Sequence, residues 1–227
     1  MSNTQEAAGK NGSNARRMNT YQKEQLQALE MVRQHMGLLE KGPGISGFDL
    51  NARMEDYLDF RQDVGSFFRR WFEQTCSENC YSSRRSACCS RDGIIVFWAD
   101  VVVNAHWSDS HELDRLEKAI RKPEKAYKCI FLTESGCVWR IKPIICEMFL
   151  CSEAEKSVFG ENPKARKGWR ELEERKKAFT WPDRLVLFEA LEKIYMAAGC
   201  DSPLMYMHKS PGLLRLIRQR KPNPPPI

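Results

Sequence analysis

The sequence predicts a mainly helical fold, either α or α+β, with helices packed around an irregular, cysteine-rich metal-binding centre. Apolar residues recur at spacings of three and four in the first and last thirds of the chain, which is the period of an amphipathic helix. Between them, residues 76–151 contain eight of the nine cysteines and only short β-branched runs. A length of 227 residues suits one domain with extensions, or two small ones.

The N-terminal part is expected to be a disordered tail, residues 1–19, followed by a helical segment, residues 20–75. The tail is polar and rich in turn-forming residues. The first helix should run from Met18 or Asn19 to about Glu40. Apolar side chains at helical spacing should line one face of it, namely Leu26, Leu29, Val32, Met36 and Leu39.

A second helix is expected from Phe48 to Trp71, with Asp49 or Asn51 as its N-cap. It carries a stripe of large apolar side chains at helical spacing, which we interpret as core packing against a neighbouring helix. The stripe consists of Tyr57, Phe60, Val64, Phe67, Phe68 and Trp71.

The middle segment, residues 76–151, mixes short elements. Ile94–Trp98 is β-branched and aromatic, which predicts a strand. Ala99–Trp107 and Glu112–Arg121 have helical spacing. Lys128–Thr133 is expected to be another short extended piece. This segment is therefore the least regular part of the predicted fold.

The C-terminal segment, residues 152–220, should return to helices. A charged helix is expected at Pro163–Lys177, an apolar one from Pro182 to about Ala198, and a short one at Pro211–Gln219, because proline is favoured in the first helical turn. Residues 221–227 contain four prolines and form a Pro-rich tail that should be extended.

The eight cysteines of the middle segment are the candidate metal ligands. They follow the spacing C-x3-C-x7-C-C and, after 39 residues, C-x7-C-x8-C-x4-C. Zinc binds four ligands in a tetrahedron, and an iron–sulfur cluster takes four thiolates, so the predicted cofactor is zinc or iron, including a 4Fe–4S cluster. The candidates are Cys76, Cys80, Cys88, Cys89, Cys129, Cys137, Cys146 and Cys151.

The cysteines have two other interpretations, as buried or redox thiols and as disulfides. The N-terminus lacks the apolar stretch of a secretory signal, and no apolar run is long enough to span a bilayer. We therefore expect a cytoplasmic location without a membrane partner, where disulfides are rare. Whether His106 or His111 joins the thiolates is left open.

Basic residues near the cysteines are candidates to offset the negative charge of metal-bound thiolates. They fit ordinary solvated charges equally well. These residues are Arg84, Arg85, Arg91, Lys128, Arg140 and Lys142.

The middle segment resembles the YkgJ-type cysteine-cluster family of zinc- or iron-chelating proteins. The family pattern has a Cys-Cys pair, an apolar strand leading to an Asp at a helix start, then C-x-F-L, another Cys, and Arg-Pro-x-x-Cys with a following Phe. This chain has Cys88-Cys89, Ile94 to Asp100, Cys129-Ile130-Phe131-Leu132, Gly136-Cys137, and Lys142-Pro143-Ile144-Ile145-Cys146 with Phe149. The resemblance implies a chelating role and assigns it most directly to Cys88, Cys89, Cys129, Cys137 and Cys146.

Three functions follow from these observations. The first is a metal-binding protein in which the ion is structural or carried. The second is an iron–sulfur enzyme, since some relatives of the family are associated with protein lysine methylation. The third is a zinc-organised adaptor for nucleic acid or protein. The sequence identifies no catalytic residue and no cofactor-binding glycine loop. A net charge of +6 is too mild to indicate nucleic acid, which is the less favoured partner.

Overall fold

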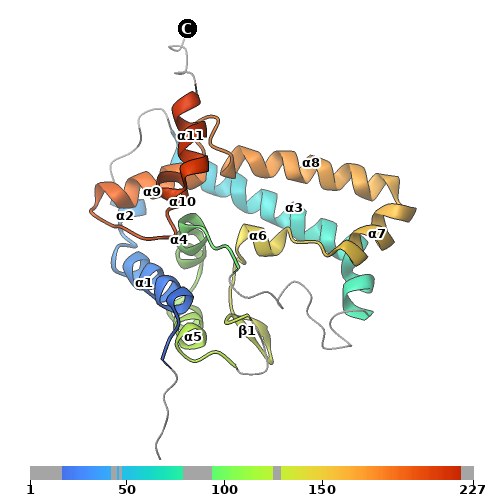
Figure 1. The fold of residues 1–227 in the computed structure, drawn as a ribbon, viewed down its shortest axis with the longest axis horizontal. Helices are drawn as coiled ribbons and strands as arrows, with labels where there is room; N and C mark the ends of the chain where they lie inside the picture. The colour runs from blue at the N-terminus through green and yellow to red at the C-terminus, as the bar shows by residue number, and fades with distance from the viewer. Residues whose placement is uncertain (1–16, 42–44, 46–47, 79–93, 125–128, 221–227) are drawn as a thin grey trace, which may run out of the picture.

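The computed structural model describes residues 17–41, 45, 48–78, 94–124 and 129–220, and within them the chain is mainly helical, as predicted (Figure 1). A two-stranded antiparallel hairpin accompanies the helices. The elements are α1 (Thr20–Gln34), α2 (Leu38–Lys41), α3 (Leu50–Cys76), α4 (Trp98–Trp107), α5 (Ser110–Arg121), β1 (Leu132–Thr133), β2 (Gly136–Cys137), α6 (Ile144–Glu147), α7 (Ser152–Glu161), α8 (Pro163–Thr180), α9 (Leu187–Ala197), α10 (Tyr206–Lys209) and α11 (Pro211–Gln219).

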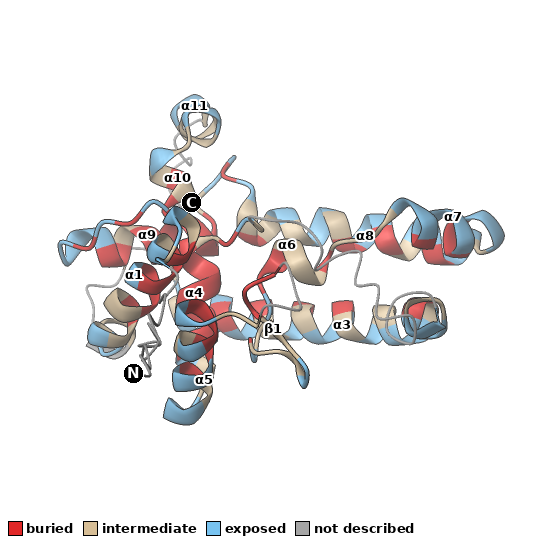
Figure 2. Ribbon diagram, turned by 60° about the horizontal axis from the view of Figure 1, so that its bottom comes forward, coloured by how far each residue is buried: buried red, intermediate tan, exposed pale blue. Residues whose placement is uncertain are grey.

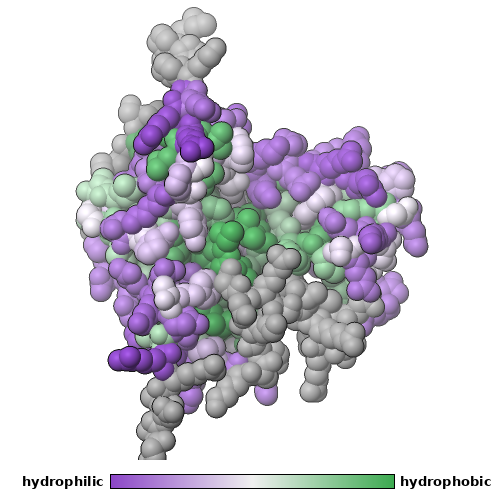
Figure 3. All heavy atoms as spheres, in the orientation of Figure 1, coloured by the Kyte–Doolittle hydropathy of each residue, from purple (hydrophilic) through white to green (hydrophobic). Residues whose placement is uncertain are grey.

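Helix α4 lies at the centre of the packing, with every residue from Trp98 to Ala105 buried (Figure 2). It contacts α1 and α9, while α3 packs against α7, α8 and α9. Figure 3 shows hydrophilic side chains over α8 and hydrophobic ones gathered at the centre of the same face. None of the described helices combines the length and apolarity that a membrane span requires.

The predicted tails lie outside the described residues, except for residues 17–19. Asn19 caps α1, since its side chain accepts a hydrogen bond from the Gln22 backbone N–H at 2.8 Å. The helix does not reach Glu40 as predicted but ends at Gln34. The backbone leaves the helical region at His35, whose Nδ1 lies 2.9 Å from the Met31 carbonyl oxygen.

The break in α1 also changes its apolar face. Leu26, Leu29 and Val32 are buried as expected, but Met36 follows the break and is 36% exposed. A hydrophobic period alone does not reveal this break, because the chain is helical again from Leu38 to Lys41, which is α2.

Helix α3 begins where the sequence predicts and confirms Asp49 as its N-cap, because the Asp49 carboxylate accepts a hydrogen bond from the Ala52 backbone N–H at 3.1 Å. The helix extends beyond the predicted end at Trp71 to Cys76. Tyr57 and Phe60 are fully buried, which confirms that the aromatic stripe packs in the core. Their rings contact Phe179 of α8, at centroid distances of 5.1 and 5.3 Å.

One predicted element is wrong and another begins late. Ile94–Trp98 is not a strand: residues 94–97 are irregular and Trp98 already belongs to α4. The Trp98 backbone N–H instead donates a hydrogen bond to the Leu204 carbonyl oxygen at 2.9 Å. The helix expected from Pro182 to about Ala198 is α9, which begins at Leu187 because residues 181–186 form the connection after α8.

The other helix predictions are confirmed within a few residues. They correspond to α4, α5, α8 and α11. Of the extended piece expected at Lys128–Thr133, only Leu132–Thr133 is a strand, β1, and residues 129–131 form a turn. Helices α6 and α10 have four residues each, too few to produce a period in the sequence.

Two carboxylates of α9 are buried against the C-terminal helices. Glu189 forms a bidentate ion pair with Arg220, at 2.6 and 2.9 Å. Glu192 accepts hydrogen bonds from the backbone N–H groups of Met207 and His208, both at 3.1 Å, and its Oε2 lies 2.7 Å from His208 Nδ1. Burial raises the pKa of Glu192 to about 8 and lowers the pKa of His208.

We expect the free energy of unfolding to fall as the pH rises from about 5 to 8 because of Glu192. The folded protein holds this proton more tightly than the unfolded chain, where the pKa has its ordinary value of 4.5. Glu192→Gln should reduce the fall by roughly 1–3 kcal/mol, measured by urea unfolding across this range. Glu171→Gln, an exposed carboxylate of α8, is the control. Parallel pH profiles for wild type and Glu192→Gln would contradict the expectation.

Candidate functional site

The hairpin positions two of the predicted metal ligands, Cys129 and Cys137. The Leu132 backbone N–H donates to the Cys129 carbonyl oxygen at 3.2 Å, and Leu132 pairs with Cys137 across the two strands. Gly136 has a φ of 106°, a backbone conformation that side chains with a Cβ rarely adopt, so glycine permits the tight turn. Cys129 is buried and Cys137 is half-buried.

The turn that carries Cys146 is held by two side chains of α4. Asp100 accepts hydrogen bonds from the backbone N–H groups of Ile144 and Phe97, both at 3.0 Å. One helical turn further, Asn104 accepts the Ile141 backbone N–H at 2.9 Å. Residues four apart share one face of a helix, so α4 presents two acceptors side by side to this chain segment. Cys146 thus sits two residues after a buried anchor point.

Asp100 is buried, and its charge state reflects competing effects. Burial has the largest effect and raises the pKa of Asp100 to about 6. The two backbone N–H groups and the nearby guanidinium of Arg61 lower the pKa, but by less. Both carboxylate oxygens are used, one for each N–H donor. A buried side chain in this position ties the first turn of α4 to the start of α6.

Tyr21 of α1 contacts the chain before α4 and the chain before the hairpin. Its hydroxyl donates to the Ile94 carbonyl oxygen at 2.8 Å, and its ring lies edge-on to Phe131 at 6.4 Å. Burial first, and then the thiols of Cys129 and Cys146, raise the pKa of Tyr21 far above its usual range. Two cysteines 17 positions apart in the sequence therefore lie near the same phenol group.

Of the other predicted cysteine ligands, two lie at helix ends and three lie outside the described residues. Cys76 is the last residue of α3. Cys151 caps α7, with its Sγ accepting the Ala154 backbone N–H at 3.4 Å. Cys80, Cys88 and Cys89 lie outside the described residues.

Among the residues that the structure describes, no group of three or more His, Cys, Asp or Glu side chains is arranged to hold a metal ion. His106 and His111 are both exposed, and the His106 ring stacks edge-on against Trp107 at 4.5 Å. A complete thiolate site would therefore need donors from residues 79–93 in addition to those described.

Of the basic residues expected to offset thiolate charge, some are described and form ion pairs, and the others lie outside the described residues. Arg140 pairs with Glu112 at 3.1 Å, and Lys142 lies 3.7 Å from Glu147. Arg84, Arg85, Arg91 and Lys128 are outside the described residues.

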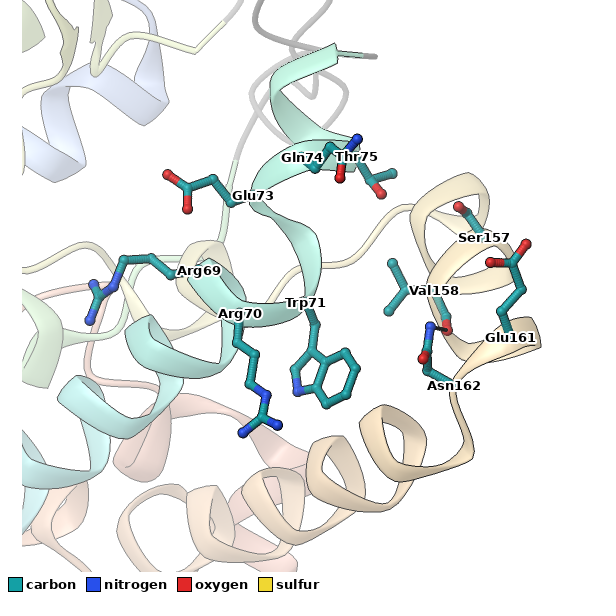
Figure 4. A pocket seen from close by; sticks show the side chains of 10 residues that line it. All are labelled: Arg69, Arg70, Trp71, Glu73, Gln74, Thr75, Ser157, Val158, Glu161 and Asn162. Carbon is teal, nitrogen blue, oxygen red and sulfur yellow. Dashed lines mark hydrogen bonds between the residues drawn. The ribbon is translucent and has the colours of Figure 1, made fainter.

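A separate cleft of about 520 Å³ lies between the end of α3 and α7 (Figure 4). Trp71 points into it, and the Arg70 guanidinium lies 5.0 Å from the centre of the Trp71 ring. Asn162, on the opposite side, uses its amide to donate to the Val158 carbonyl oxygen at 3.2 Å. The lining residues include no cysteine and no histidine, so this cleft is distinct from the cysteine-bearing turn.

Comparison with known proteins gives no further guidance: no family model matches, and neither curated proteins nor solved structures match the chain.

Sequence reasoning missed Tyr21 and Asn104. Tyr21 lies 108 positions before Cys129, so only the packing of α1 brings it there. Asn104 had a detectable signal, because a polar residue within the apolar run Val101 to Ala105 is expected to have a buried hydrogen-bond partner.

Asp100→Ala should destabilise the protein by roughly 2–4 kcal/mol, because it leaves the buried Ile144 N–H unsatisfied and removes the acceptor in the first turn of α4. Asp100→Asn keeps one acceptor and should cost less. Denaturant unfolding measures both, and amide hydrogen exchange at Ile144 should accelerate. Asp114→Ala, which removes an exposed partner of Arg33, is the control and should cost about 1 kcal/mol or less. Equal losses for Asp100→Ala and Asp114→Ala would refute this role of Asp100.

Proposed function

We propose that the chain is a metal-binding cysteine-cluster protein that holds zinc or iron through thiolates of residues 76–151. The observation that carries the proposal is the concentration of eight of the nine cysteines in residues 76–151, two of which, Cys129 and Cys146, raise the pKa of the same residue, Tyr21. Thiolates brought together from distant parts of a chain are the ligand type that zinc and iron–sulfur clusters select.

Cys137 of the hairpin is a further candidate donor. It pairs with Leu132, which lies three residues after Cys129. Cys129, Cys137 and Cys146 are not arranged as a three-ligand group among the described residues, so the proposed site also takes thiolates from residues 79–93.

Cys88 and Cys89 are the favoured source of the remaining ligands. They precede Ile94 by six and five positions, and the Ile94 carbonyl oxygen accepts the hydrogen bond of Tyr21. An extended chain advances at most about 3.6 Å per residue, so a stretch of six residues before Ile94 can span at most about 22 Å. Cys76, Cys80 and Cys151 remain further predicted ligands.

The resemblance to the YkgJ-type family supports the same function. Its Asp at a helix start corresponds to Asp100, and its Pro-x-x-Cys corresponds to Pro143 and Cys146. The Asp100–Ile144 hydrogen bond joins these two parts of the pattern and offers a physical reason for their recurrence together.

The metal determines which of the remaining functions applies. A 4Fe–4S cluster would favour an iron–sulfur enzyme such as a relative of the protein lysine methylases. Zinc together with salt-dependent binding to RNA or DNA would favour a zinc-organised adaptor. Zinc without such binding would favour a structural or carried ion, and a protein partner is then the interaction to look for.

Elemental analysis of protein purified with and without oxygen should find about one zinc ion or one iron–sulfur cluster per chain. Cys129→Ser and Cys146→Ser should each weaken metal binding at least about tenfold, because a thiolate ligand is lost. Cys200→Ser is the matched control: this thiol is also buried, but it follows α9 and lies outside residues 76–151.

Wild-type protein that contains no zinc or iron, and takes up neither after reduction and reconstitution, would refute the proposed function. Equal metal binding by the Cys146→Ser and Cys200→Ser variants would instead remove Cys146 from the site.

A further inference from the structure

Arg61 of α3 is a buried cation with an unusual set of neighbours. Its Nη1 donates to the Tyr57 hydroxyl at 2.9 Å, and its Nη2 donates to the Lys142 carbonyl oxygen at 2.7 Å. The side chain is only 9% exposed, and its Nε has no hydrogen-bond partner among the described residues. Arginine stays charged when buried, so this position carries a permanent positive charge.

No carboxylate forms a close pair with that charge in the described part of the chain. Glu147 is the nearest acidic ion-pair partner, with its Oε2 3.8 Å from Arg61 Nη2, and it is shared with Lys142. A buried charge is costly unless it is hydrogen-bonded or paired.

The contacts of Arg61 fall on both sides of one cysteine. Lys142 precedes Cys146 by four positions, and Glu147 follows it directly. Asp100 holds Ile144 in the same turn from the other helix, α4. The turn is thus fixed from two helices at residues 142, 144 and 147.

We propose that Arg61 is a positioning residue for Cys146. Its guanidinium bonds Tyr57 through Nη1 and contacts the turn on both sides of the cysteine through Nη2, which holds the Cys146 thiol in position before a metal binds. This inference rests on the proposed metal-binding function for its purpose, but it makes a separate claim about the metal-free protein. Arg61 lies outside the segment that resembles the YkgJ-type family.

The first readout is the metal-free, reduced protein. Arg61→Met should raise the rate at which iodoacetamide alkylates Cys146 at least about fivefold relative to Cys200, followed by mass spectrometry, because the half-buried thiol is no longer held. Arg61→Lys should behave like Arg61→Met, because one ammonium group cannot reproduce a planar fork that bonds two acceptors.

The second readout is the zinc affinity, measured by competition with a chromophoric chelator. Both Arg61 variants should bind zinc roughly 10–100-fold more weakly at unchanged stoichiometry, the usual cost of losing a residue that orients a ligand. Arg175→Met is the matched control, because Arg175 also contacts α3, pairing with Asp63 at 2.8 Å and lying 5.4 Å from the Phe60 ring, without touching the Cys146 turn.

Unchanged alkylation of Cys146 in a folded Arg61→Met or Arg61→Lys protein would overturn the inference, whether or not the protein binds metal. If wild-type protein binds neither zinc nor iron, the proposed function fails. The alkylation rates still test whether Arg61 restrains Cys146. If circular dichroism shows that both Arg61 variants are unfolded, Tyr57→Phe and Glu147→Gln replace them. These remove one partner each and keep the buried cation, and an unchanged Cys146 rate in both would likewise overturn the inference.

Discussion

The buried hydrogen bond from the Ile144 backbone N–H to Asp100 is the interaction on which the rest of the candidate site depends. It joins the most deeply buried helix, α4, to the turn that carries Cys146. A buried N–H without an acceptor costs about 1–3 kcal/mol, so the turn has little freedom to move away from α4 while the core is intact. The core therefore determines where this thiol can be.

This arrangement differs from a small zinc finger, in which the metal itself supplies the folding energy. Here α1, α3, α4 and α9 bury a continuous set of apolar and aromatic side chains, and the segments that carry the cysteines add Cys129, Phe131 and Ile144 to the same core. Asp100 and Arg61 each connect that core to the Cys146 turn, and Tyr21 contacts Phe131 next to the hairpin. If an ion binds as we propose, these contacts would hold Cys146 in place without it.

The sequence was informative wherever a pattern was long. The aromatic stripe of α3, its Asp49 cap and helices α4, α5, α8 and α11 follow from period and capping chemistry alone. It failed where tertiary contacts override local preference, as at Ile94–Trp98, which supplies backbone groups to Tyr21 and Leu204 instead of to a strand. The same limit hid Arg61, which meets the Cys146 turn 81 positions further along the chain.

The central claim is that several thiolates, including those of Cys129 and Cys146, bind one metal site. X-ray absorption at the metal edge tests it most directly, because the scattering identifies the ligand atoms. For zinc-loaded protein we expect a shell dominated by sulfur at about 2.3 Å, and loss of part of that shell in Cys146→Ser. A first shell of nitrogen and oxygen alone, at about 2.0–2.1 Å, would contradict the account.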